Sequence, residues 1–246
     1  MLRKEYQFCN GYLERMHERL TENYGVSIGY STLTQRVREL GLGQKSSQRA
    51  AHVPDVPGEE MQYDTSPFDV KLNGKKVRII CFGLYYRYSK IRYIKFYFSD
   101  NRFNMKCFLD EALRYWGYCA VICIIDNTCL AVWYGTGADA VFHPEMNHFG
   151  QNYGFSWKAH ALGHANRKAG KERNFKTVIT NFLAGRTFTS PEDLNRQAFD
   201  WATDRFAKRP QSKTKLIPIE TFEKEKAHLR KLPEYIPLPY EIIKPD

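Results

Sequence analysis

The stretch that most constrains the fold is YCAVICIIDN, residues 118–127, which is apolar almost without interruption until it ends in Asp126 and Asn127. A continuous apolar run indicates a strand buried on both faces, as in a mixed sheet covered by helices. Four elements are predicted before this strand: strands at 59–72, 76–86 and 91–98, and a helix at 104–116. Three strands, a helix and a central buried strand form the opening order of the ribonuclease H-like fold.

The remaining patterns place helices around this sheet. Helices are predicted at 3–24, at 31–41 with Ser31 as N-cap, at 144–153, at 170–184 and from Ser190 onwards. We therefore expect an α/β fold, with a ribonuclease H-like mixed five-stranded sheet flanked by helices and a small helical segment before it. The expected domains are a helix-turn-helix-like DNA-binding segment at 1–41, a linker at 42–58, the ribonuclease H-like core at 59–205 and a proline-rich extension at 206–246.

Three acidic residues occupy positions where a carboxylate is unusual. Asp64 lies inside the first predicted strand, Asp126 ends the buried strand, and Glu172 lies in the later helix among many cations. Each residue alone has an ordinary alternative, such as a turn residue or a solvated side chain. If the two strands are neighbours, however, the acids converge at a strand end, where α/β sheets place their ligands. Converging carboxylates are stabilised by Mg²⁺ or Mn²⁺, and two such ions catalyse the cutting and joining of phosphodiesters.

The charge of the chain favours a polyanionic partner. Its 246 residues contain 37 Lys and Arg against 27 Asp and Glu, a formal net charge of +10. Such an excess is typical of nucleic-acid-binding proteins, although a basic enzyme of another kind is an alternative. The predicted DNA contacts are Gln35, Arg36 and Arg38 on the second helix, and Arg167, Lys168, Lys171, Arg173 and Lys176 around Glu172.

Other features argue against alternative classes of site and compartment. None of the six cysteines forms a CxxC pair, so a zinc ribbon is not expected. His160 and His164 are four apart, as helical metal ligands can be, but a third ligand is lacking and a DNA-facing or structural role is favoured. The N-terminus has no apolar signal core and no run is long enough to span a membrane. The expectation is a cytoplasmic, bacterial, nucleoid-associated protein.

Four stretches together resemble the IstA-type transposases of bacterial insertion sequences, within the DDE superfamily of retroviral-integrase-like catalytic cores. GEEMQYDTSP and IIDNTCLAV resemble the two aspartate motifs of that family. GKERNFKTVITNFLAGRTF resembles its glutamate helix, and SPEDLNRQAFDW resembles the helix that follows. The N-terminal YSTLTQRVREL is similar to its second DNA-reading helix, so the resemblance covers about residues 28–235.

The resemblance implies that residues 59–205 are an integrase-type catalytic core whose triad is Asp64, Asp126 and Glu172. It also implies two divalent ions, nicking at transposon ends, strand transfer into target DNA, homo-multimers on DNA and a helper ATPase of the IstB type. The sequence departs from the family at Thr128-Cys129-Leu130, where a lysine is usual, which puts one DNA contact in doubt. Family members are longer at both ends, so the resemblance leaves two alternatives: a truncated copy, or a piece excised from a longer protein.

Two other functions remain open on the sequence alone. A catalytically inactive DNA-binding remnant, acting as a repressor through residues 1–41, would need only the basic surface. A ribonuclease H-like nuclease that cuts without joining would need the three carboxylates but not strand transfer.

Overall fold

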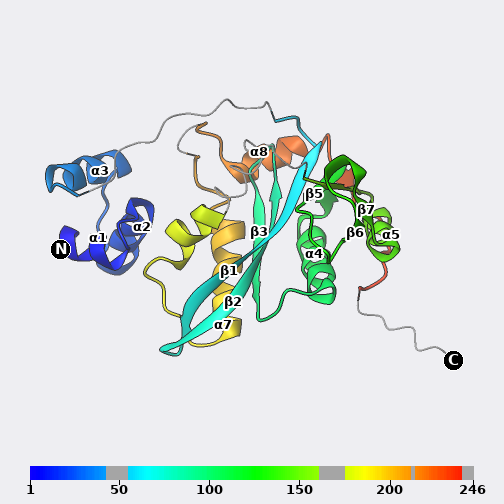
Figure 1. Ribbon diagram of the computed structural model, residues 1–246. Helices are drawn as coiled ribbons and strands as arrows, with labels where there is room; N and C mark the ends of the chain where they lie inside the picture. The colour runs from blue at the N-terminus through cyan, green and yellow to red at the C-terminus, as the bar shows by residue number, and fades with distance from the viewer. Residues whose placement is uncertain (43–54, 161–174, 212–213, 240–246) are drawn as a thin grey trace.

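The computed structural model describes residues 1–42, 55–160, 175–211 and 214–239. At its centre is a five-stranded sheet with the order β3-β2-β1-β5-β8 (Figure 1). The strands are β1 (Glu60–Leu72), β2 (Lys75–Tyr86), β3 (Arg92–Tyr97), β5 (Ile122–Ile125) and β8 (Ser156–Ala159). The first three pair antiparallel, whereas β5 lies parallel between β1 and β8. This mixed order is that of the ribonuclease H-like fold, so the predicted fold class is confirmed.

The β1–β2 hairpin forms the long axis of the sheet. Asn73 and Gly74 have φ angles of 46° and 77°, which a two-residue hairpin turn requires at both positions. The strands pair without a shift from Leu72 opposite Lys75 to Met61 opposite Tyr86. The Asn-Gly signal thus fixes the register, and with it the face of the sheet to which each side chain points.

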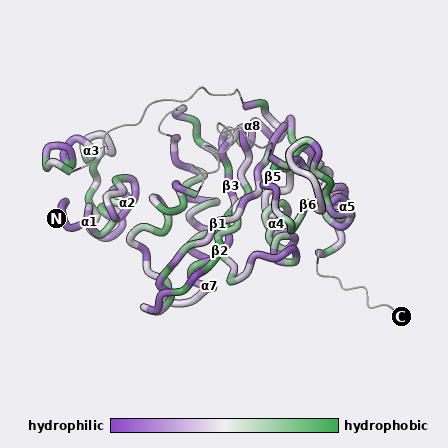
Figure 2. The backbone as a smooth tube through the Cα atoms, in the orientation of Figure 1, coloured by the Kyte–Doolittle hydropathy of each residue, from purple (hydrophilic) through white to green (hydrophobic). Residues whose placement is uncertain are grey.

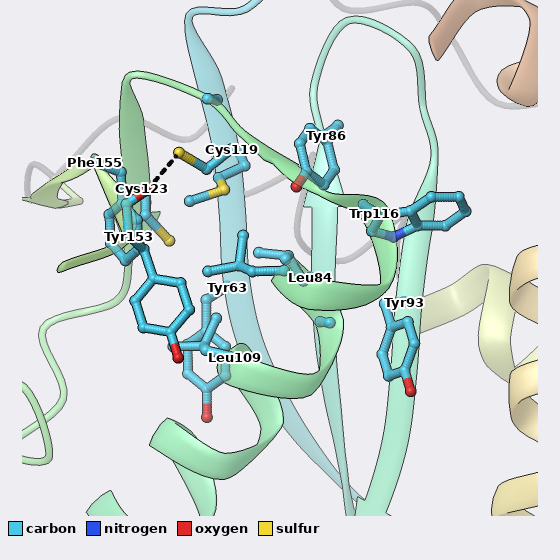
Figure 3. Packing of buried hydrophobic residues seen from close by; sticks show 14 of the residues in the cluster. Tyr63, Leu84, Tyr86, Tyr93, Leu109, Trp116, Cys119, Cys123, Tyr153 and Phe155 are labelled. Atoms are coloured by element: carbon cyan, nitrogen blue, oxygen red, sulfur yellow. Dashed lines mark hydrogen bonds between the residues drawn. The ribbon is translucent and has the colours of Figure 1, made fainter. Parts of the chain in front are cut away.

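Helices cover both faces of this sheet. Helix α4 (Arg102–Trp116) packs on one face, against β2 and β3. Figure 3 shows the core on this face, where Tyr63, Leu84 and Leu109 lie together and the Cys119 thiol donates to the Tyr153 carbonyl at 3.1 Å. The opposite face is covered by α7 (Pro191–Asp200) and by two π-helices, η2 (Val178–Leu183) and η3 (Trp201–Arg205).

The apolar run at 118–127 does not form one strand, which corrects the prediction. It is divided into β4 (Tyr118–Cys119) and β5. β4 pairs with β9 (Arg230–Lys231) in a separate small sheet, whereas β5 pairs with β1 and β8. Because the two halves hydrogen-bond to partners in different sheets, the chain bends between them at Ala120 and Val121.

The N-terminal segment contains three helices: α1 (Leu2–Phe8), α2 (Leu13–Tyr24) and α3 (Tyr30–Glu39). The prediction of one helix at 3–24 is wrong because Asn10 and Gly11 have left-handed φ angles of 52° and 79°. The N-cap of α3 is Gly29 instead of Ser31. Each helix alternates between hydrophilic and hydrophobic residues (Figure 2), and their apolar sides share a core of Cys9, Met16, Leu20, Leu33 and Val37.

The remaining elements lie at the edges. They are β6 (Val132–Tyr134), the 3-10 helix η1 (Gly137–Asp139), β7 (Val141–Phe142), α5 (Pro144–Tyr153) and α8 (Pro218–Glu225). The predicted helices at 144–153 and from Ser190 onwards are confirmed, and the Ser190 hydroxyl caps α7 by accepting from the Asp193 N–H at 3.1 Å. Within the described ranges, each helix is too short or too polar to cross a membrane.

Candidate functional site

The strand register places Asp64 and Asp126 side by side. In the parallel pair β1–β5, Gln62 is opposite Ile124. Two residues farther along each strand direction come Asp64 and Asp126, and a step of two residues returns to the same face of a sheet. On the other side of β5, Lys158 is opposite Ile124, and His160 follows two residues later. The backbone N–H of His160 donates to the Ile125 carbonyl at 2.9 Å, which extends this alignment past the end of β8.

One pocket collects these side chains from separate elements. Its walls include Asp64 from β1, Asp126 from the end of β5 and His160 from the end of β8. Phe175 and Val178 close it from the side of the later helix. The complete set of lining residues is Gln62, Tyr63, Asp64, Gly83, Leu84, Tyr85, Arg92, Ile94, Asp126, His160, Phe175 and Val178.

Both aspartates are half-buried, and their surroundings are held by backbone and side-chain hydrogen bonds. The Thr65 N–H donates to Asp64 Oδ1 at 2.8 Å, which orients that carboxylate. Beside Asp126, the Asn127 side chain donates to the His160 carbonyl at 3.0 Å and accepts from the Gly137 N–H at 3.1 Å. Asn127 therefore ties the loop after β5 to the end of β8, a positioning role that the sequence motif alone does not reveal.

The third predicted acid, Glu172, lies outside the described residues, as do Arg167, Lys168, Lys171 and Arg173. Phe175, three positions after Glu172, is helical and packs on the sheet beside Gly83. A Cβ at Gly83 would lie 3.7 Å from the Phe175 ring, so the glycine leaves room for the ring against β2. The first described turn of the helix predicted to carry Glu172 thus forms a wall of the pocket that holds Asp64 and Asp126.

This helix differs from the predicted one in its second half. Residues Val178–Leu183 form a π-helix, and the left-handed Gly185, at φ 63°, follows the end. Arg15 from α2 donates through Nε to the Ala184 carbonyl at 3.2 Å and is itself buried. The N-terminal helices are therefore docked on the end of the helix that closes the pocket. Lys176, on the first described turn, is exposed.

The other predicted DNA contacts lie on α3, which Figure 1 shows apart from β1, the strand that contains Asp64, and β5, the strand that ends just before Asp126. Leu33 and Val37 of this helix are buried in the N-terminal core, while Gln35, Arg36 and Arg38 are exposed. Glu39 accepts from Gln35 at 3.0 Å and pairs with Arg36 at 2.9 Å. A pair this exposed contributes little to stability, so its cation can exchange partners readily.

The donors in the pocket suit a hard divalent cation. Two neighbouring carboxylates supply oxygen ligands, which Mg²⁺ and Mn²⁺ prefer. In the described part of the chain, no group of three His, Cys, Asp or Glu residues is arranged to hold a metal. A third ligand would therefore have to come from elsewhere, and Glu172 is the predicted one. His160 lies directly after β8, while His164 lies outside the described residues, so the spacing of these two histidines stays a sequence observation.

Sequence comparison identifies relatives with one shared role. The putative transposase of insertion sequence element IS5376 from Geobacillus stearothermophilus is 25% identical over 73% of this chain and 45% of its own length. The transposase of insertion sequence element IS21 from Pseudomonas aeruginosa is 25% identical over 77% of this chain and 49% of its own. The chain is a homologue of insertion-sequence transposases. It spans about half the length of these relatives.

The likeness to transposases of bacterial insertion sequences is thus confirmed, while the IstA subtype stays a prediction. No protein-family model matches the chain. Among solved structures, the magnesium complex of the HTLV-2 integrase catalytic core is similar, with 11% identity, a TM-score of 0.43, and coverage of 68% of this chain and 97% of that one. At that distance the fold assignment rests on the strand order of the sheet itself.

Proposed function

We propose that this transposase homologue cleaves and joins DNA strands at the pocket that contains Asp64 and Asp126, with Glu172 as the third acid. The observation that carries the proposal is the parallel β1–β5 register, which brings the two aspartates into one pocket from positions 62 residues apart. Phe175 and Val178, which follow Glu172 in the sequence, lie on another wall of the same pocket. This arrangement could bring together three carboxylates that are far apart in the sequence.

In this proposal Asp64, Asp126 and Glu172 together bind two divalent metal ions. The ions are Mg²⁺ or Mn²⁺. The bound metal would supply an activated oxygen nucleophile and stabilise the leaving oxygen of the phosphodiester. The protein's own part is to hold the carboxylates in fixed positions. Thr65 orients Asp64 through its N–H, and Asn127 fixes the loop that follows Asp126. Apolar side chains such as Phe175 and Val178 exclude water from one side.

The proposed substrate is double-stranded DNA at the ends of a mobile element, together with target DNA. The formal charge of +10 provides the general attraction to phosphates. Exposed Lys176 lies on the helix at the pocket, and Gln35, Arg36 and Arg38 are exposed on α3, where they can contact DNA. Assembly into homo-multimers on DNA and a helper ATPase of the IstB type belong to the same proposal, and both concern the complete transposase.

A second candidate is a DNA-binding chain without catalytic activity. The exposed polar residues of α3 favour it, because their contacts with DNA would not need the carboxylates. The two candidates differ in what a carboxylate-to-amide change does. Under both candidate functions this substitution should leave DNA binding nearly intact. It should abolish strand cleavage only if the pocket is catalytic.

The test is a gel assay with labelled duplex DNA that carries the element's own ends, in Mg²⁺. Wild type should give nicked and joined products, while Asp126→Asn and Glu172→Gln should each reduce both by at least about 100-fold, because disrupting even the outer partners of metal ligands costs 10–100-fold. The matched control is Asp69→Asn at the far end of β1, where Asp69 pairs with Lys76 at 3.1 Å. Equal activity in wild type and in both acid-to-amide variants would reject the proposal. If wild type nicks DNA but does not join it, the protein would be a nuclease without strand-transfer activity.

A further inference from the structure

Arg92, the first residue of β3, is a buried cation on the wall of the same pocket. Its exposed fraction is 7%. In the sheet, Arg92 is opposite Tyr85, and Tyr85 is opposite Gln62. Two residues farther along each strand, and on the same face of the sheet, Ile94 is opposite Gly83 and Gly83 is opposite Asp64. Arg92 and Asp64 therefore lie on the same face of the sheet. They are two strands apart and offset by two residues along the strand direction.

The contacts of Arg92 are with aromatic rings. Its guanidinium carbon lies 3.7 Å from the centre of the Phe206 ring, and 5.7 Å and 5.8 Å from those of Tyr85 and Trp201. Among the described residues Arg92 forms no ion pair with a carboxylate, and its buried Nε has no hydrogen-bond acceptor. Burial lowers the pKa of Arg92 to about 10, so the side chain keeps its charge at neutral pH.

A second arginine, Arg186, which is partly buried, shows what is unusual about Arg92. Arg186 also lies over a ring, that of Phe182 at 5.3 Å, and burial lowers its pKa to about 10 as well. Arg186, however, lies 3.8 Å from the carboxylate of Glu18 and does not line the pocket. A buried charge without a counter-ion costs several kcal/mol, of which stacking on rings returns about 2. Arg92 bears this cost on the wall of the pocket that contains Asp64 and Asp126.

We propose that Arg92 binds a non-bridging phosphate oxygen of the DNA strand that enters the pocket and so positions that strand against Asp64 and Asp126. A phosphodiester is the anion that fits, because the planar guanidinium can offer two parallel N–H groups to two of its oxygens. The rings of Phe206, Trp201 and Tyr85 hold the guanidinium plane before the ligand arrives. This inference rests on the proposed function, since it assumes that DNA occupies the pocket.

The experiment measures binding without cleavage, in buffer lacking Mg²⁺, by fluorescence anisotropy of labelled DNA. A series of oligonucleotides carries one neutral methylphosphonate each, moved stepwise along the strand. With wild-type protein, one position should weaken binding by about 10-fold or more, the value of a charge-assisted hydrogen bond. The Arg92→Met variant should bind unmodified DNA more weakly than wild type by the same factor. The methylphosphonate at that position should not weaken the binding of this variant any further.

The control is Arg78→Met on the adjacent strand β2, where the side chain is 67% exposed and pairs with Asp69 at 3.4 Å. It should weaken binding only slightly, and its effect should add to that of every methylphosphonate. Arg92→Lys keeps the charge but not the planar fork, so it should retain part of the coupling. The thermal midpoint of Arg92→Met should stay level or rise, because the variant removes a buried charge that has no carboxylate partner in the described structure.

The inference is overturned if the loss of affinity caused by Arg92→Met adds to the loss caused by the methylphosphonate at every position. A large fall in the thermal midpoint of Arg92→Met would also overturn it, because Arg92 would then have a structural role. The two proposals fail separately. If Asp126→Asn still cleaves DNA while Arg92 couples to one phosphate, the carboxylate chemistry is wrong and the anion site stands. If Asp126→Asn abolishes cleavage and Arg92 couples to no phosphate, the carboxylate chemistry stands and the anion site is wrong.

Discussion

The two faces of strands β1 to β3 are built from alternate residues of the same segments. Each face packs a hydrophobic core, but the face opposite α4 also carries the pocket that contains Asp64. On the α4 face, Tyr63, Phe82 and Leu84 are closed into an aromatic and aliphatic core. On the other face, the same strands present Asp64, Gly83 and Arg92 to a pocket. The period of two thus lets one hairpin serve both as the base of the core and as the floor of the site.

The largest effect on stability is expected on the α4 face. Phe82 is fully buried, and its ring centre lies 4.6 Å from that of Tyr97 and 5.7 Å from that of Phe108. Phe82→Ala should lower the free energy of unfolding by about 3–5 kcal/mol, because the remaining rings cannot fill the cavity. Urea denaturation measures the change. Asp64→Asn, on the other face, should change it by less than about 1 kcal/mol. Equal losses in the two variants would contradict the division between the faces.

A medium effect is expected at Gly83, opposite Asp64 in the register. An alanine Cβ there meets only ordinary contacts, the nearest being 3.7 Å from Phe175, and Gly83 does not need a left-handed φ. Gly83→Ala should therefore raise the free energy of unfolding by about 0.4–1 kcal/mol. Gly83→Leu should lower it by about 2–3 kcal/mol and displace Phe175 together with the helix that approaches the carboxylates. Cleavage assays on both variants check this: activity retained in Gly83→Leu would show that the Phe175 contact does not set the site.

An effect smaller than that of Gly83→Leu concerns Asp55, which precedes β1 and pairs with Arg87 and Lys90 of the β2–β3 turn. Burial by itself raises the pKa of its carboxyl, but hydrogen bonds from Lys90 at 2.6 Å and Arg87 at 2.7 Å outweigh it and hold the pKa below its ordinary value. A carboxyl with a lowered folded-state pKa stabilises the protein above its unfolded pKa, and that stability is lost as pH falls through the folded pKa.

Asp55→Asn should accordingly cost about 1.5 kcal/mol of unfolding free energy at neutral pH. The difference from wild type should shrink as the pH falls below about 4, the ordinary pKa of an aspartate. Thermal unfolding at a series of pH values measures it. A difference that stays constant down to pH 2 would show that the two hydrogen bonds do not depend on the charge of Asp55.

Local patterns in the sequence predicted the elements that depend on near neighbours. Asn73-Gly74 predicted the hairpin, the periodicity of 104–116 predicted α4, and Ser190 predicted the start of α7. Where the pattern failed, a non-local partner or a backbone detail decided. The run at 118–127 is divided because β4 pairs with a strand more than 100 residues later. The helix at 3–24 breaks because Asn10 and Gly11 adopt left-handed conformations.

For the site, the sequence by itself identified Asp64 and Asp126 as unusual acids on strands, because a carboxylate inside or at the end of an apolar strand needs a reason. Only the tertiary structure decided that they are neighbours, since this depends on which strands pair and in what register. Arg92 gave no signal in the sequence, where an arginine opening a strand is ordinary. Its burial without a carboxylate among the described residues arises when α7 and η3 fold over the sheet, and that packing couples residues more than 100 positions apart.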